Sequence, residues 1–300
     1  MGQILLGAVA LGLLWAVMTI GVYITYRILG IADLTVEGSI TLGAAVSTAM
    51  IQSGQDPYFA MIIALLSGAG AGFVSGFLHT KLRIPALLSG ILTMIALWSV
   101  NLRVMGSANV SILRLATIYT PIQTLGASKY VSWVSVGCIL AIGIVSILYW
   151  FFGTELGSAI RATGNNPNMV RAQGINTDNM ILLGLMISNG LVALSGSLIA
   201  QSQAFSDIQM GTGSIVIGLA SLIVGEVLFG RRNFYLRLLS LIFGAITYRI
   251  IIAIVMEIGM HPNDLKLFTA ITVAIALSTP RFREYLQTIL KSLKGGRAAC

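Results

Sequence analysis

The sequence predicts an all-α integral membrane protein, a polytopic bundle of about nine transmembrane helices (about eight to ten), some of them short and broken. Two observations support this fold class. Of the 300 residues, 56% are hydrophobic and only 9% are charged, whereas ordinary soluble domains carry about 25% charged residues. The apolar residues also gather in runs that approach the roughly 20 residues needed to cross a bilayer.

The predicted spans follow one another along the chain. They lie at residues 4–24, 39–53, 58–79, 84–104, 130–151, 179–201, 213–229, 236–258 and 264–279. The first run is too long for the apolar core of a cleavable signal, which has roughly 7–15 residues, and no basic segment precedes it. We therefore expect this run to be retained as a span.

Two of these runs, 39–53 and 214–229, are short and rich in small residues. Short, glycine-interrupted segments often line the pathway of a transporter as broken helices. Close packing of helices through small residues explains the same composition. The sequence leaves both interpretations open.

A long polar segment, residues 153–179, lies between the fifth and sixth runs and predicts two short helices. Gly153 or Thr154 can begin the first helix, and Glu155 favours its N-terminal turn. An apolar stripe on this helix would comprise Leu156, Ile160 and residues 162–163.

The first short helix should break at residues 164–167. Gly164 tolerates a left-handed backbone, and the residue before Pro167 avoids the helical region. Asn168 would then cap a second helix that ends near Gly174. The result is a helix–turn–helix along the membrane surface, and a plain solvated loop is the alternative.

Basic residues predict the orientation. If segment 153–179 is cytoplasmic, the alternation of spans assigns thirteen Lys and Arg residues to the cytoplasmic side and four to the other. Those four are Arg103, Arg114, Lys129 and Lys266. Because basic residues are enriched on the cytoplasmic side, we expect an external N-terminus and a cytoplasmic C-terminus. The same rule explains the net charge of +8 without a nucleic-acid partner.

Two regions divide the chain. Residues 1–280 are expected to form a single transmembrane domain. Residues 281–300 are expected to form a cytoplasmic tail, in which apolar residues recur at helical spacing opposite basic ones. Such a tail is suited to the anionic lipid of the cytoplasmic leaflet.

The sequence contains no pattern typical of catalysis or of cofactor binding. It has no phosphate-binding glycine loop that ends in Lys followed by Ser or Thr, so we do not expect it to bind ATP itself. His79 and His261 lie near span ends on opposite sides, and Cys138 and Cys300 lie far apart. We therefore expect no metal site, no structural disulfide and no enzymatic activity.

Four stretches carry a family resemblance. In the polar segment, the matching residues are Gly157, Arg161, Ala162, Gly164, Asn166, Pro167, Ala172, Gly174 and Ile175. The other stretches are residues 30–44, 83–94 and 213–230, in the same order. Together they resemble ABC importer permeases of the ribose and branched-chain amino acid type. Glu37 before Gly38 departs from the usual family pattern, and this form looks closest to the subgroup proposed to import tryptophan, tyrosine or related solutes.

The resemblance implies that the polar segment holds a coupling helix, which sits in a groove of a cytoplasmic ATPase. Its coupling residues would be Glu155, Gly157, Arg161, Ala162, Gly164, Asn166, Pro167, Ala172 and Gly174. The implied partners are a second permease copy, two cytoplasmic ATPase subunits that bind the ATP, and an external or lipid-anchored solute-binding protein. The implied location is the bacterial cytoplasmic (inner) membrane. The implied solute is an amino acid, aromatic ones included, with a sugar or a nucleoside as the alternative.

Polar side chains within or beside the spans are candidates for the solute path. They are Asp33, Glu37, Thr93, Asn101, Ser188 and Asn189. Each of them could instead form hydrogen bonds between helices. Arg249 and Glu257 lie in one span, where charges are costly and suggest either function or pairing inside the bundle. The runner-up function is an ion-coupled secondary transporter, which would need buried carboxylates such as Glu226 and Glu257.

Overall fold

The computed structural model describes residues 2–126, 128–230, 233–259, 264, 267–271 and 274. The long helices are α1 (Gly2–Tyr23), which continues as the π-helix η1 (Ile24–Leu29), α2 (Thr35–Gln52), α3 (Pro57–Thr80), α4 (Ala86–Met105), α6 (Lys129–Gly153), α9 (Thr177–Gln203), α10 (Ser214–Phe229) and α11 (Phe234–Glu257). The short helices are α5 (Thr120–Thr124), α7 (Glu155–Asn165) and α8 (Pro167–Ala172). Strands β1 (Asn109–Ser111) and β2 (Phe205–Asp207) form one antiparallel pair.

The helices confirm an all-α membrane protein. Within the described residues, six helices are long and apolar enough to cross a membrane: α1 with η1, α3, α4, α6, α9 and α11. The shorter α2 and α10 account for the two short runs. The ninth predicted span falls largely outside the described residues, and the predicted tail falls wholly outside them.

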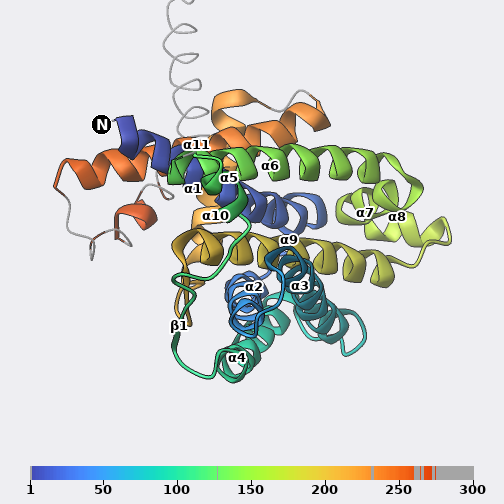
Figure 1. Ribbon diagram of the computed structural model, residues 1–300. Coiled ribbons are helices and arrows are strands. Elements are labelled where there is room, and N and C mark those ends of the chain that lie inside the picture. The colour runs from blue at the N-terminus through green and yellow to red at the C-terminus, as the bar shows by residue number, and fades with distance from the viewer. Residues whose placement is uncertain are drawn as a thin grey trace, which may run out of the picture.

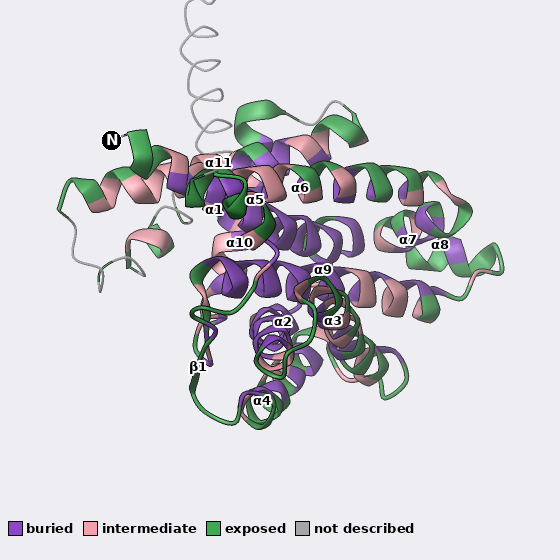
Figure 2. Ribbon diagram, in the orientation of Figure 1, coloured by how far each residue is buried: buried purple, intermediate pink, exposed green. Residues whose placement is uncertain are grey.

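Helix α9 lies in the middle of the molecule, with α2, α3 and α4 on one side and α1, α6 and α11 on the other (Figure 1). The central helices are the most enclosed. In the most apolar stretch of α9, 72% of the residues are buried, and the same holds for α1 with η1. In the corresponding stretch of α4, 28% are buried. Figure 2 shows the same contrast between a purple interior and green outer faces.

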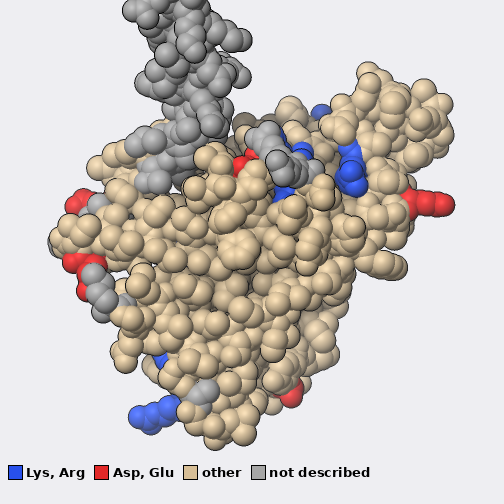
Figure 3. Space-filling model, turned by 90° about the horizontal axis from the view of Figure 1, so that it is seen from above, with Lys and Arg blue, Asp and Glu red and all other residues tan. Residues whose placement is uncertain are grey.

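The outer faces of α3, α4 and α6 are apolar and exposed. Examples are Leu66, Ile95, Ile142 and Trp150. Charged atoms occupy few places on the face shown in Figure 3. A soluble monomer rarely exposes so large an apolar surface, whereas lipid solvates it without penalty. The chain is therefore a multi-pass membrane protein.

Glycines bring α2 and α3 unusually close to α9. A Cβ atom on Gly43 would collide with the backbone of Ala193, and one on Gly72 with the carbonyl of Leu185. Only a residue without a side chain fits such contacts, and close backbone approach is a common way to pack membrane helices. The small residues of run 39–53 thus serve packing.

The first two spans are joined by a short non-helical link in which Asp33 is buried. The chain turns at Gly30, which has φ +70°, and residues 30–34 lack regular structure before α2 begins. The Asp33 carboxylate accepts the backbone N–H of Thr35 at 2.9 Å. A buried carboxylate needs such internal partners. The predicted short run 39–53 is itself unbroken, because its residues 39–52 lie within the continuous helix α2.

Candidate functional site

The polar segment forms the two short helices that the sequence predicts. Thr154 caps α7, because its Oγ1 accepts the backbone N–H of Gly157 at 3.4 Å. Glu155 occupies the first turn, where a negative charge is favourable. The start of α7 is therefore confirmed.

The cap of α8 differs from the prediction. Asn166, rather than Asn168, caps this helix, since its Oδ1 accepts the backbone N–H of Met169 at 3.1 Å. The reason is Pro167, which suits the first helical position and forces the preceding residue into an extended conformation. Asn166 has φ −152° and ψ 90°, which lies outside the helical region. The left-handed glycine of the segment is Gly174, with φ +82°.

Two expectations about α7 are wrong. Gly164 does not have a positive φ; it is a helical residue within α7. A Cβ atom there would collide with the carbonyl oxygen of Ile28 in η1. Leu156 does not belong to the buried stripe, which comprises Gly157, Ala159, Ile160 and Thr163. The reason is the tertiary contact with η1 and the end of α6, which selects the face with the smallest residues.

The outer face of these helices is available to a partner. Leu156 is 52% and Met169 is 46% exposed. The exposed predicted coupling residues are Glu155, Arg161, Asn166, Pro167, Ala172 and Gly174; Ala162 is half-buried. The sequence analysis placed Leu156 in the buried stripe and did not single out Met169, so it missed both as surface residues.

Two arginines hold the short helices against the bundle. The Arg171 Nε donates to Thr177 Oγ1 at 2.6 Å, and its Nη2 lies 3.4 Å from Asp178 Oδ1. The Arg161 guanidinium lies 5.1 Å from the ring centre of Phe234. α8 is thereby tied to α9, and α7 to α11. The spacing of an arginine six and seven residues before Thr177 and Asp178 is a signal that the sequence did contain.

Several predicted path residues form a buried network in the middle of α9. Asn189 donates to Asp33 Oδ2 at 2.7 Å and accepts from Ser39 at 2.7 Å. The Ser188 hydroxyl donates to the carbonyl of Gly21 at 2.7 Å. The Thr93 hydroxyl bonds within its own helix, to the carbonyl of Ser89. Asp33, Ser188 and Asn189 therefore connect separate parts of the bundle, whereas the hydrogen bond of Thr93 stays within α4.

Glu37 and Asn101 line a cleft of about 350 Å³, which we name the α2/α4 cleft. Its other lining residues include Thr41 of α2, Met94 and Trp98 of α4, and Ile208 and Thr212 of the segment before α10. The sequence analysis missed Trp98, because nothing in the sequence distinguishes it from the other apolar residues of its span.

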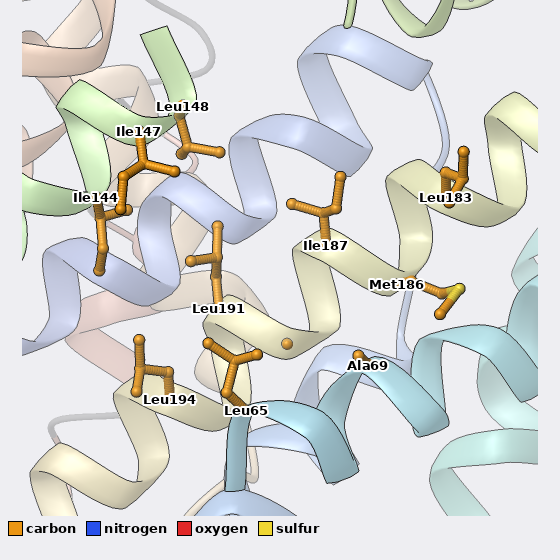
Figure 4. Close-up of a pocket in the computed structure, with 11 residues that line it drawn as sticks. Leu65, Ala69, Ile144, Ile147, Leu148, Leu183, Met186, Ile187, Leu191 and Leu194 are labelled. Carbon is orange, nitrogen blue, oxygen red and sulfur yellow. The ribbon is translucent and has the colours of Figure 1, made fainter. Parts of the chain in front are cut away.

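A second cavity is entirely apolar. It lies between α3, α6 and α9, and Figure 4 shows lining side chains from all three helices, among them Leu65, Ile147 and Leu191. It offers no polar side chain that could replace the water around a polar solute. It is therefore not a candidate for a polar solute path.

The two carboxylates that an ion-coupled transporter would need do not lie free inside the bundle. Glu226 Oε1 lies 3.1 Å from Arg27 Nε. The Arg249 guanidinium lies 4.2 Å from the ring centre of Trp15, and Glu257 is an exposed residue at the end of α11. Within the described residues, no group of three or more metal-ligating side chains occurs.

The chain has clear relatives. A family described as the permease component of branched-chain amino acid transport systems matches residues 4–277. The tyrosine transport system permease protein of Clostridioides difficile (strain R20291) is 40% identical over 271 residues, which cover 89% of this chain and 88% of that protein. An uncharacterized protein of Rickettsia prowazekii (strain Madrid E) is 34% identical, over 92% of this chain and 98% of that protein.

More distant relatives carry other transport names. The autoinducer 2 import system permease protein LsrC of Yersinia enterocolitica is 28% identical over 63% of this chain and 52% of that protein. No solved structure matches the chain. The match over residues 4–277, the multi-pass helical fold and the paired short helices of the polar segment agree: the chain belongs to the ABC transport permeases of the branched-chain amino acid type.

Proposed function

We propose that this chain is the membrane-spanning subunit of an ATP-driven importer that carries an amino acid, with aromatic amino acids the favoured class. It would work as a homodimer with two cytoplasmic ATPase subunits and an external solute-binding protein, in the bacterial cytoplasmic membrane. The observation that carries the proposal is the α7–α8 pair. Its outer face exposes Leu156 and Met169, while its inner face packs on η1 without room for a side chain at Gly164.

This packing supplies a route for motion. A push on α7 would reach η1 through the contact between Gly164 and Ile28. From η1 it would reach α9 through Leu29, whose side chain packs on Gly184. It would then reach α2 through the hydrogen bond between Asp33 and Asn189. Close-packed elements transmit displacement because they cannot deform continuously.

The amino acid class is supported by two observations. The relative with 40% identity is named as a tyrosine transport permease. The α2/α4 cleft combines the carboxylate of Glu37 with the apolar side chains of Met94 and Trp98. The relatives named for autoinducer 2 import are less similar, which leaves a sugar or a nucleoside as the second candidate.

Reconstitution tests the proposal. The chain would be placed in liposomes with the ATPase and the solute-binding protein of the same transport system. We expect ATP-dependent uptake of L-tyrosine or another aromatic amino acid, and ATP hydrolysis that rises when the binding protein is loaded. The chain alone should hydrolyse no ATP. Gradient-driven uptake by the chain alone would contradict an importer subunit, and uptake of a pentose but no amino acid would reverse the order of solutes.

A further inference from the structure

The α2/α4 cleft lies where two helices begin inside the molecule. α2 starts beside the middle of α9, because Ser39, one turn into α2, bonds with Asn189. α10 starts at Gly213, whose backbone N–H donates to Glu37 Oε1 at 3.0 Å. Gly213 has φ +80°, and Gly211 packs against the backbone of Glu37 so closely that no side chain would fit. The chain is therefore shaped to bring Glu37 to the N-terminus of α10.

This contact suits a carboxylate. The N-terminus of a helix carries a partial positive charge and unpaired N–H groups, and it meets the half-buried side chain of Glu37 there. Among the described residues that line the cleft, Glu37 carries a charge and none is basic. This lining favours a cationic group over an anionic one.

Asn101 provides a second, independent sign of a ligand. Its side chain is only 1% exposed, and its Nδ2 donates to the carbonyl of Gly38 at 3.2 Å. Within the described part of the chain, its Oδ1 has no hydrogen-bond partner. A buried acceptor without a donor is costly, and this one belongs to a residue that lines the cleft.

The rest of the lining is apolar or aromatic. Trp98 is 43% exposed and Met94 and Ile208 complete this side of the cleft. A volume of about 350 Å³ falls within the range of small-molecule sites, about 300–1,000 Å³. An aromatic face also attracts cations.

We infer that the α2/α4 cleft binds an organic ammonium compound with an apolar or aromatic side chain, and that Glu37 and Asn101 Oδ1 accept hydrogen bonds from its ammonium group. Trp98 packs against its side chain. The inference rests on the proposed function in that the natural ligand is the transported amino acid, held during its passage. The inference adds to the proposed function that this cleft recognises the ammonium group of the ligand.

The test uses the full-length chain in lipid nanodiscs. Cys138 and Cys300 are replaced by serine, and Thr212→Cys places a thiol at the cleft. The rate of its reaction with a water-soluble maleimide is measured with phenylalanine, phenethylamine or phenylpropionate present. We expect phenylalanine and phenethylamine to slow the reaction, because both carry an ammonium group. Equal protection by phenylpropionate, which lacks that group, would overturn the inference.

Glu37→Gln identifies the carboxylate as the recognising group. Glutamine keeps an oxygen that can accept from Gly213, so the cap of α10 is retained while the charge is lost. We expect about ten times more phenethylamine to be needed for half protection, which corresponds to about 1.4 kcal/mol. The matched control is Asp56→Asn, which removes a carboxylate from the cap of α3 and should change nothing. An unchanged half-protecting concentration in Glu37→Gln would show that Glu37 is only a helix cap.

A second variant protects the test against misfolding of the first. Trp98→Ala removes a partly exposed side chain, so the bundle should tolerate it. It should weaken protection by phenethylamine and hardly alter protection by methylamine, and an equal effect on both would overturn the inference. Because the assay needs neither ATPase nor binding protein, it can fail while ATP-dependent uptake of an amino acid still holds, and it can succeed while that uptake fails.

Discussion

Gly164 is the residue at which a single methyl group should matter most. A Cβ atom there would collide with the Ile28 carbonyl oxygen, so Gly164→Val must push α7 away from η1. Overpacking of this kind costs about 1–3 kcal/mol, which a bundle of this size should survive. We expect normal insertion but a sharp loss of solute-stimulated ATP hydrolysis and of uptake in the reconstituted complex.

Gly153→Val is the matched control for that substitution. A Cβ atom on Gly153 meets no atom within 4 Å, and the residue ends the helix just before α7. It should leave uptake near the wild-type level. Wild-type stimulation and uptake in Gly164→Val would mean that the polar segment is an ordinary connection.

Asn189 should contribute to the stability of the folded protein. Asn189→Leu removes the donor to Asp33 and the acceptor for Ser39, and it leaves both groups buried without that partner. An unsatisfied buried polar group costs about 1–3 kcal/mol, more when charged. We expect a lower unfolding temperature in detergent, measured by fluorescence-detected thermal unfolding. Ser146→Leu on the exposed side of α6 is the control. Equal unfolding temperatures of the two variants would show that the network has no structural role.

Single residues also show what the sequence could not predict. The cap of α7 at Thr154 follows from local chemistry, and Thr154 was one of the two residues predicted to begin this helix. The packing of Gly164 on Ile28 joins positions far apart in the chain, so local reasoning assigned that glycine to a left-handed turn instead. Likewise Asn101 was a candidate by polarity, but its bond to the Gly38 carbonyl, and the lack of a partner for its Oδ1 among the described residues, depend on how α4 packs on α2.

At the scale of elements, α7 and α8 should form the docking surface for the ATPase. Leu156→Glu places a carboxylate where an apolar side chain is 52% exposed. Burying that charge against a partner without a counter-charge is costly, so we expect less ATPase to copurify with the tagged permease, with unchanged permease yield.

The control for docking lies on another element. Leu125 is 86% exposed just after α5, and Leu125→Glu should leave the copurified amount of ATPase unchanged. If Leu156→Glu retains as much ATPase as Leu125→Glu, the ATPase binds elsewhere on the molecule.

Hydrophobic runs predicted where the elements lie because lipid imposes length and composition on each span. α2 and α10 were correctly found as short elements. The sequence did not show why they are short. Each begins where a carboxylate from another part of the fold or from just before the helix accepts a backbone N–H: Asp33 from Thr35 at the start of α2, and Glu37 from Gly213 at the start of α10. The tail 281–300 stays a prediction.

At the scale of the whole molecule, the fold makes the orientation testable with two positions. α7 and α8 precede α9, and β2 follows it, so the two short helices and the strand pair lie at opposite ends of the central helix (Figure 1). The distribution of basic residues predicts that the end with α7 and α8 is cytoplasmic. Leu113 is 72% exposed near the strand end, and Met169 is 46% exposed in α8.

Cysteine labelling in intact cells should therefore distinguish the two ends. In a chain with Cys138→Ser and Cys300→Ser, Leu113→Cys should react with a membrane-impermeant maleimide, and Met169→Cys should react only after the membrane is permeabilised. The expectation rests on charge, since moving basic loops across the bilayer is unfavourable, and the structure fixes that the two positions lie at opposite ends. Labelling of Met169→Cys from outside would show that the protein has the opposite orientation in the membrane. The ATPase could then not reach α7, and the coupling role of Gly164 and Leu156 would fall with the orientation.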